Sequence, residues 1–326
     1  MKRLAPTINL VVLVSLTLFA LSVGATQVDN FWQALFNPGG NEILWQIRLP
    51  RVFAAVLVGA ALGIAGLMAQ GACNNALAEP AILGTSAGAS FGAVAGILFG
   101  FVQIGSLGAI VCGAIGALLA TSLTFRLASL RNNLSSFALV IVGIAVSASI
   151  TAVVGLAATM VTRADARSIS FWSFGSLSLI TAENLVGLLL VVSIGALIAW
   201  KVAPSLDLLS LGESTAFHLG VNIRKTRALA LISLSILAGG AVSTVGTIAF
   251  LGLAGPHIAR FIYGPAHRFL VIQSALIGAT VLVLADTAAR TIAQPNELPI
   301  GLVTSLIGAP ILIALVVMKN TTWRTP

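Results

Sequence analysis

Charge is what this sequence has least of. Aspartate, glutamate, lysine and arginine make up 8% of the 326 residues, whereas an average soluble domain has about 25%. A water-soluble globule of this length needs a charged surface, so the scarcity excludes one. The apolar share of 58% excludes a disordered chain, and its spread from end to end excludes a soluble domain on a single anchor. The mean hydropathy of +1.06 therefore predicts a polytopic membrane protein.

Cysteine and histidine are scarce as well. Cys73 and Cys112 stand alone in apolar stretches, which excludes a disulfide framework. The three histidines, His218, His257 and His267, are too far apart to suggest a metal cluster. We therefore expect no metal site and no cofactor in this chain. The net charge of +8 comes from basic residues scattered between apolar runs, so it indicates membrane topology rather than nucleic-acid binding.

Long stretches without charged residues predict about ten membrane-spanning helices, because about 20 apolar residues cross a bilayer as a helix. The predicted spans are 7–25, 51–71, 83–101, 106–126, 135–160, 183–203, 228–249, 251–263, 269–291 and 300–318. Their runs are continuous rather than alternating, which favours helices over a β-barrel. Lys2-Arg3 before an apolar run resembles a secretory signal, but the length of this run and the later spans favour an uncleaved first helix.

Ten spans put both ends of the chain on one side of the membrane, and the positive-inside rule identifies that side as the cytoplasm. With this orientation, all but five of the 17 lysines and arginines fall at the cytoplasmic ends of the spans. The exceptions, which need another explanation, are Arg48, Arg51, Arg163, Arg167 and Arg290.

Glycine recurs every fourth residue in the third predicted span, at Gly84, Gly88, Gly92, Gly96 and Gly100. Residues four apart share one face of a helix, so this stripe predicts close packing against another backbone. Gly59 and Gly63 predict the same for the second span.

The two halves of the chain show a weak internal repeat. Gly113-Ala114 recurs as Gly278-Ala279, and Gly143 recurs as Gly308, both at an offset of 165 residues. Leu83-Gly84 recurs as Leu251-Gly252 at an offset of 168. Chance agreement is the alternative in a chain with 32 glycines. A true repeat would relate spans 2–5 to spans 7–10, a common arrangement in transporters.

One motif raises an enzyme hypothesis. Gly84-Thr85-Ser86-Ala87-Gly88 fits the G-x-S-x-G pattern of serine hydrolases, in which Ser86 would be the nucleophile. That pattern needs a strand-to-helix elbow, whereas here it lies in the glycine stripe of a predicted helix. An intramembrane hydrolase is therefore a minor alternative, and we expect no enzyme activity in this chain.

The chain lacks the parts of an energy-coupling site. Lys225-Thr226 ends a segment faintly like a phosphate loop, but Arg224 occupies the position of its second glycine. Carboxylates that would couple a proton or sodium gradient are few, and Asp286 is spaced to pair with Arg290, four residues later. We therefore expect another molecule to supply the driving force. A self-sufficient secondary carrier is the alternative.

The longest predicted cytoplasmic loop spans 204–227. In it, Gly212 and Gly220 bracket a short segment that carries Ala216, Phe217 and Leu219. A short helix with apolar residues, bounded by glycines, is typical of a segment that docks into a partner's groove. A helix lying flat on the membrane is the alternative.

Several motifs follow one another along residues 44–318. They are Arg48-Leu49-Pro50-Arg51, Asn75-Ala76-Leu77-Ala78-Glu79-Pro80 with Leu83-Gly84, Leu211-Gly212-Glu213 with Leu219-Gly220, Phe250-Leu251-Gly252-Leu253 with Pro256-His257 and Arg260, Asp286 with Arg290, Glu297-Leu298-Pro299 with Gly301, and Gly308-Ala309-Pro310. In order and spacing they resemble the FecCD-type permeases, the membrane subunits of ATP-binding-cassette importers for iron–siderophore complexes, haem and cobalamin. Ala76 departs from the family, which usually has proline there, and we expect only a local change in loop stiffness.

The resemblance implies a single transmembrane permease domain over residues 1–326, with the type II ABC importer fold and the loop 204–227 as its coupling loop. It implies import of a ferric siderophore across the bacterial inner membrane by alternating access, with haem and cobalamin as the next candidates. The implied partners are a cytoplasmic ATPase dimer, which binds ATP and magnesium, and a periplasmic or lipid-anchored binding protein. A second permease copy or a sister permease would complete the membrane unit.

The resemblance also implies roles for individual residues. Those that couple to the ATPase are Gly212, Glu213, Ala216, His218, Leu219 and Gly220. Those that dock the binding protein are Arg48, Arg51 and Arg290, with lipid headgroup anchoring as the alternative. Those that form the cytoplasmic gate are Asn75, Leu77, Ser135, Ser136 and Phe137. Those that line the translocation path are Gly143, Ser147, Thr151, Thr304 and Ser305. Arg163 and Arg167 lie in no family motif.

Overall fold

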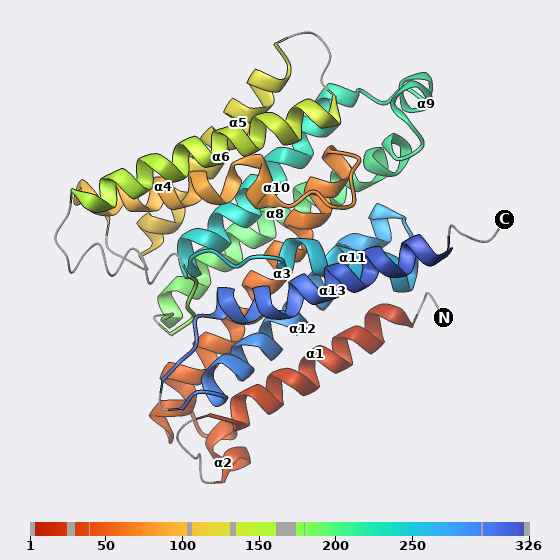
Figure 1. Ribbon diagram of the computed structural model, residues 1–326. Coiled ribbons are helices and arrows are strands. Elements are labelled where there is room, and N and C mark those ends of the chain that lie inside the picture. The colour runs from red at the N-terminus through yellow and green to blue at the C-terminus, as the bar shows by residue number, and fades with distance from the viewer. Residues whose placement is uncertain are drawn as a thin grey trace.

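The computed structural model describes residues 4–24, 30–38, 40–102, 106–130, 135–160, 174–178, 180–294 and 296–322. In this part of the chain every regular element is helical (Figure 1). The elements are α1 (Ala5–Ser22), α2 (Phe31–Phe36), the π-helix η1 (Ile43–Arg48), α3 (Leu49–Ala72), the 3-10 helix η2 (Pro80–Leu83), α4 (Thr85–Leu98), α5 (Leu107–Ala128), α6 (Ser136–Thr159), α8 (Ala182–Leu209), α9 (Glu213–His218), α10 (Ile223–Val245), α11 (Leu251–Tyr263), α12 (His267–Thr291) and α13 (Ile300–Thr322).

Each of the ten predicted spans overlaps one of these helices, so the predicted all-α membrane architecture is confirmed. Seven helices in the described residues are long and apolar enough to cross a membrane unaided. Two others, α4 and α11, have only 14 and 13 residues. They are short because each begins after a residue with positive φ, Gly84 at +86° and Phe250 at +63°. An α-helix cannot continue through that backbone conformation.

The two helices that flank the predicted loop 204–227 extend into it. The helix expected to end at residue 203 continues through Pro204 to Leu209, and α10 begins at Ile223 rather than 228. The added turn of α8 buries Leu206 and Leu209 almost completely. This burial stabilises the helix enough to tolerate a proline, which lacks one backbone donor. Residues 210–222 remain as the connection, with α9 inside it.

Helix lengths and packing reveal two repeats, α3–α6 and α10–α13. The first has helices of 24, 14, 22 and 24 residues, and the second has helices of 23, 13, 25 and 23. The first helix of each repeat packs along the third helix of the other, α3 on α12 and α10 on α5. The short helices also cross over, with α11 against α3 and α4 against α10.

The repeated glycines occupy equivalent places in these contacts. A Cβ atom added to Gly113 of α5 would lie 2.3 Å from Ser243 Cβ of α10, and one added to Gly278 of α12 would lie 2.3 Å from the Gly59 carbonyl oxygen of α3. Real Cβ atoms do not approach other atoms so closely, so only glycine permits either helix pair. The internal repeat suspected from sequence is therefore real in three dimensions.

Gly143 and Gly308 form the second equivalent pair. A Cβ atom on Gly143 of α6 would lie 2.4 Å from the Ile82 carbonyl oxygen, directly before α4. One on Gly308 of α13 would lie 2.5 Å from Phe250 Cβ, directly before α11. The fourth helix of each repeat thus packs on the residues that precede its short helix.

The predicted five-glycine stripe is only partly a packing surface. Cβ atoms on Gly88 and Gly92 would lie 2.5 Å and 2.2 Å from backbone carbonyl oxygens of α5, so these two glycines pack as expected. Gly84 precedes α4, and Gly100 follows it with no atom within 4 Å of its Cβ position. Both have positive φ, so they serve turns at the helix ends.

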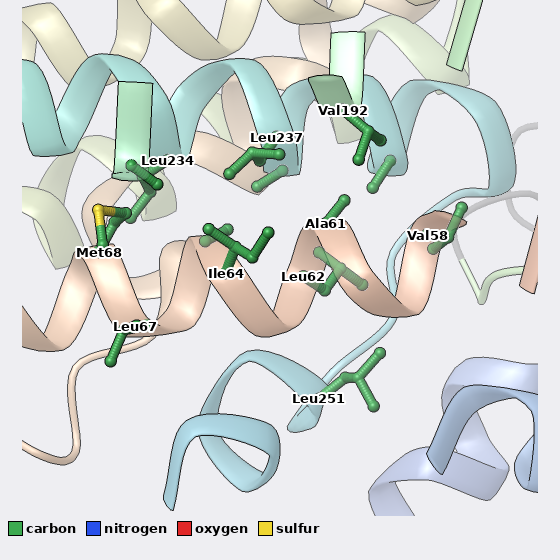
Figure 2. Close-up of a cluster of buried hydrophobic side chains, with 14 of the residues drawn as sticks. Val58, Ala61, Leu62, Ile64, Leu67, Met68, Val192, Leu234, Leu237 and Leu251 are labelled. Atoms are coloured by element: carbon green, nitrogen blue, oxygen red, sulfur yellow. The ribbon is translucent and has the colours of Figure 1, made fainter. Parts of the chain in front are cut away.

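The core is centred on α3 (Figure 2). The α3 side chains Val58, Ile64 and Met68 belong to one buried cluster with Leu234 and Leu237 of α10, and Met68 and Ile64 lie nearest these two leucines. In contrast, α1 and α6 lie at the periphery and bury few of their residues. The beginning of α1, the end of α13 and α9 lie at one end of the bundle, and α2 lies at the opposite end (Figure 1).

Candidate coupling, gating and docking sites

The segment α9 lies between two glycines in the left-handed region, Gly212 with φ +106° and Gly220 with φ +82°. Other residues rarely adopt this conformation, so glycine fixes the sharp turns at both ends. Ala216 is completely buried against the rest of the chain. Phe217 and Leu219 are 68% and 56% exposed. One face of α9 therefore rests on its own chain while apolar side chains of the other face point outward.

This arrangement divides the predicted coupling residues into two groups. Ala216 has no surface left for a partner, and Glu213 turns toward α10. His218 and Leu219 are exposed, together with Phe217, which the sequence marked as an apolar residue of this segment. A contact with an ATPase through α9 stays a prediction, and these three side chains are among the exposed ones available for it.

Arg227 of α10 is a central residue that sequence reasoning missed. Its side chain is fully buried, and its Nη2 donates to Glu213 Oε1 at 2.7 Å and to Ser136 Oγ at 3.1 Å. Its Nε donates to the Ala72 carbonyl oxygen at 3.0 Å. In the sequence, Arg227 stands directly before a long uncharged span. The positive-inside rule explained its charge there, so nothing indicated that its side chain contacts other helices.

The predicted gate residues lie on the two segments that Arg227 joins. Asn75 and Leu77 belong to the loop after α3, where Asn75 Oδ1 accepts a hydrogen bond from the Leu77 amide at 2.9 Å. Ser135 caps α6, accepting from the Ala138 amide at 3.1 Å. Phe137 is largely exposed. The structure thus brings these segments together at the α9 end of the bundle; their gating role stays a prediction.

Glu79 ties the loop after α3 to the start of α11. Its Oε1 accepts a hydrogen bond from the Phe250 amide at 2.9 Å. Burial raises the pKa of the Glu79 carboxyl above its ordinary value, and the hydrogen bond from Phe250 only partly offsets this rise. The carboxylate also satisfies a donor at the N-terminus of a helix, where negative charge is favoured.

The predicted path residues lie on two different flanks of the bundle. On α6, Gly143 is buried, Ser147 donates to the Ala81 carbonyl oxygen at 2.9 Å, and Thr151 is exposed. On α13, Thr304 and Ser305 both donate to the Gly301 carbonyl oxygen of their own helix, at 3.1 Å and 2.7 Å. The main contacts of α6 are with α4, α5 and η2, and those of α13 are with α11 and α12. That these residues line a path stays a prediction.

At the opposite end of the bundle, Arg51 joins α3 to α12. Its Nη2 lies 2.9 Å from Asp286 Oδ1, and its Nη1 lies 2.7 Å from Glu297 Oε1. The expected pair of Asp286 with Arg290 is present at 3.5 Å. Sequence reasoning therefore found the weaker partner of Asp286 and missed the closer one, because Arg51 lies 235 residues away.

Arg48 and Arg290 hold the end of α1. Arg48 Nη1 donates to the carbonyl oxygens of Leu21 and Ser22 at 2.9 Å and 3.1 Å, and Arg290 Nη2 donates to that of Ala20. Cations are favoured at a helix C-terminus, where carbonyls have no partner within the helix.

The three candidate docking arginines, Arg48, Arg51 and Arg290, are only 4%, 8% and 6% exposed. In this conformation their guanidinium groups serve contacts within the chain, and docking of a binding protein stays a prediction. Arg163 and Arg167 lie outside the described residues.

The hydrolase alternative finds no support in the geometry. Ser86 lies in the first turn of α4, and residues 4–24, 30–38, 40–102, 106–130, 135–160, 174–178, 180–294 and 296–322 contain no β-strand. The strand-to-helix elbow that the motif requires is therefore not formed there.

Comparison with known proteins matches residues 10–318 to the FecCD transport family. The hemin transport system permease protein HmuU of Yersinia pestis is 36% identical over 317 residues, which cover 95% of this chain and 94% of the relative. The iron(3+)-hydroxamate import system permease protein FhuB of Bacillus subtilis is 35% identical, over 89% of this chain and 77% of the relative. The vitamin B12 import system permease protein BtuC of Vibrio vulnificus is 35% identical, over 96% and 93%.

A solved structure agrees with these sequence matches. A metal-chelate type ABC transporter in an inward-facing conformation superposes with a TM-score of 0.85 and 30% identity, covering 96% of this chain and 98% of that chain. Helix order, the two repeats and the family match along nearly the whole sequence therefore agree. The chain is a multi-pass permease that belongs to the FecCD transport family.

Proposed function

We propose that this chain is the permease subunit of an ATP-binding-cassette importer that carries a ferric siderophore across the bacterial inner membrane. The observation that carries the proposal is the family match over residues 10–318, with relatives named as permeases of hemin, hydroxamate and vitamin B12 systems. Both termini and α9 would face the cytoplasm, because the beginning of α1, the end of α13 and α9 share one end of the bundle and the basic residues favour that side.

A cytoplasmic ATPase dimer, binding ATP and magnesium, would supply the driving force. The exposed Phe217, His218 and Leu219 of α9 would enter a groove on that partner, as an amphipathic helix does. Closure of the ATPase dimer would move α9 and switch the permease between outward and inward openings, which is alternating access. This division of labour fits a chain without a phosphate loop of its own.

A second permease copy, or a sister permease, would complete the path. The path residues of α6 and α13 lie on different flanks of one copy, so two copies are needed for these helices to face one another across a shared axis. α6 also leaves large apolar side chains exposed, among them Ile144, Val153 and Leu156. A partner helix would cover this surface.

The cargo would be bound mainly by a separate periplasmic or lipid-anchored binding protein. No Asp, Glu, Lys or Arg occurs in α6, so the side chains of this helix offer no charged group that would bind a large chelate. The binding protein would dock at the α2 end of the bundle, where Arg48, Arg51 and Arg290 lie. Because these arginines are buried, they would act either after rearrangement or by holding the loops of that end in place.

Transport by purified proteins tests the proposal. The permease is reconstituted into liposomes with its co-purifying ATPase and binding protein, and uptake of ferric hydroxamate, haem and cobalamin is measured with and without ATP. We expect ATP-dependent uptake of the ferric hydroxamate. ATP-dependent uptake of haem or cobalamin alone would move the cargo assignment to that compound. Uphill uptake by the permease alone would contradict the proposal and support a secondary carrier.

Exchange of the exposed α9 residues tests the ATPase contact. We expect Phe217→Asn with Leu219→Asn to weaken ATPase binding, because apolar anchors dominate such interfaces. Ser214→Asn, on an exposed residue of the same segment, is the matched control. Equal binding by both variants would show that α9 is not the docking segment.

A further inference from the structure

Arg227 carries a charge in the interior of a membrane protein, and it is the largest of the fully buried side chains in the described part of the chain. A buried charge is costly unless it is paired and hydrogen-bonded. Arg227 has such partners on three other helices, at distances of 2.7, 3.0 and 3.1 Å. Its guanidinium therefore joins α10 to α3, α6 and α9 at one point.

Each of the three partners is the first or last residue of a helix, in or beside a candidate coupling or gate segment. Glu213 is the first residue of α9. Ala72 is the last residue of α3, directly before the loop that carries Asn75 and Leu77. Ser136 is the first residue of α6, between Ser135 and Phe137. Arg227 thus contacts the candidate coupling segment and both candidate gate segments.

We propose that Arg227 is the positioning residue that transmits displacement of α9 to the two gate segments, an inference that rests on the function proposed above. When a partner pulls α9, the Glu213 carboxylate moves with it and draws the guanidinium. The same rigid group then shifts the end of α3 and the start of α6 together.

The chemistry of arginine suits this task. Its planar guanidinium presents five N–H donors in fixed directions, so one group binds several acceptors with a defined geometry. The Ala72 carbonyl at the C-terminus of α3 carries partial negative charge, which strengthens that contact. A lysine at the same position keeps the charge but has a single nitrogen, which cannot reproduce the fork.

The attachment of α9 to the rest of the chain makes the ion pair decisive. α9 packs against α8 and α10; the buried Ala216 methyl group is one of its contacts, and the Glu213–Arg227 pair is an ion pair with a buried residue. Glu213 is half-exposed, whereas the Arg227 side chain is fully buried. The pair therefore joins the solvent-facing segment to the interior of the bundle.

The test compares Arg227→Lys with Arg126→Lys in the reconstituted complex of permease, ATPase and binding protein. Arg126 is exposed in the last turn of α5, so it is a matched control for the chemical change. Two quantities are measured: substrate transported per ATP hydrolysed, and the distance between spin labels on Ile141→Cys in the two copies, with and without trapped ATP. The label is placed in a Cys112→Ala background.

For Arg227→Lys we expect the complex to assemble and hydrolyse ATP, while transport per ATP falls about tenfold, the effect of losing one charge-assisted hydrogen bond. The distance between the labels should no longer respond to ATP. Arg126→Lys should behave like the parent. Adding Glu213→Gln to Arg227→Lys should cause no further loss, because both changes break the same link.

Two results would overturn the inference. One is unchanged transport per ATP with labels that still respond. The other is a parallel fall in hydrolysis and transport with a lower melting temperature, which indicates that Arg227 only stabilises the fold. Absence of ATP-driven transport by the unmodified complex is a separate outcome, and it would overturn the proposed function together with this inference.

Discussion

Arg51 and Asp286 form a buried ion pair between two core helices. Asp286 is only 1% exposed, and its carboxylate accepts from Arg51 at 2.9 Å while facing Arg290 at 3.5 Å. We expect Asp286→Asn to lower the free energy of unfolding by about 3–5 kcal/mol, because it removes the buried counter-charge that Arg51 and Arg290 share. Chemical denaturation in detergent measures this loss.

Glu297 provides the control for that prediction. It contacts the same guanidinium at 2.7 Å, but its side chain is 43% exposed. We expect Glu297→Gln to lower the free energy of unfolding by less than about 1 kcal/mol, because water screens the pair. Equal losses in the two variants would contradict the assignment of Asp286 as the main partner.

Glu79 gives a pH-dependent prediction. Burial raises the pKa of its carboxyl above 4.5 in the folded chain. The resulting contribution to stability is complete below the unfolded pKa, and it is lost as the pH rises through the folded pKa. Glu79→Gln cannot ionise, but it keeps an oxygen for the Phe250 amide. We therefore expect the melting temperature of the variant to rise relative to that of the parent as the pH is raised from about 4 to about 8. A difference in melting temperature that does not change with pH would contradict this.

At the scale of helices, the close contact of α3 with α12 depends on glycine. A Cβ atom on Gly63 would lie 2.1 Å from the Ser274 carbonyl oxygen. We expect Gly63→Ala to lower the free energy of unfolding by about 1–3 kcal/mol, because the two backbones must separate. Gly155 of α6 has no atom within 4 Å of its Cβ position, so Gly155→Ala should stabilise by up to about 1 kcal/mol. Thermal unfolding of both variants in one detergent distinguishes these outcomes.

The existence of the helices was predictable from sequence, but some of their ends were not. Uncharged runs predicted ten spans, each of which overlaps a helix in the described part of the chain, because the bilayer imposes a length that composition alone reveals. The predicted end of α8 at residue 203 fell short of Leu209, since the burial of Leu206 and Leu209 is a tertiary effect. The repeat was visible at Gly113 and Gly278, yet only the shared contacts distinguish it from chance.

The candidate sites were less predictable than the fold. Motifs selected Glu213, Ser136 and Arg51, but not what these residues contact. Arg227 lies 155 residues from Ala72 and 91 residues from Ser136, and no local pattern in the sequence reports such a contact. The arginines expected at the surface are buried for the same reason, since their partners come from distant helices.

For the whole molecule, the two ends of the bundle should face opposite compartments. Ser214 of α9 and Gln33 of α2 are both exposed, and the two helices lie at opposite ends of the bundle (Figure 1). In intact cells we expect an impermeant thiol reagent to label Gln33→Cys and to spare Ser214→Cys until the membrane is opened. The unmodified chain, with buried Cys73 and partly buried Cys112, provides the background. Labelling of both positions from outside would contradict the orientation.

The way α1 is secured has a consequence for biosynthesis. This helix is synthesised before α3 and α12, yet its terminal carbonyls are held by Arg48, 27 residues after Leu21, and by Arg290, 270 residues after Ala20. Its hydrogen bond from Asn9 to Gln273 spans 264 residues. The helix is thus made well before the residues that fix it, and a nascent chain halted before α12 would hold it only loosely.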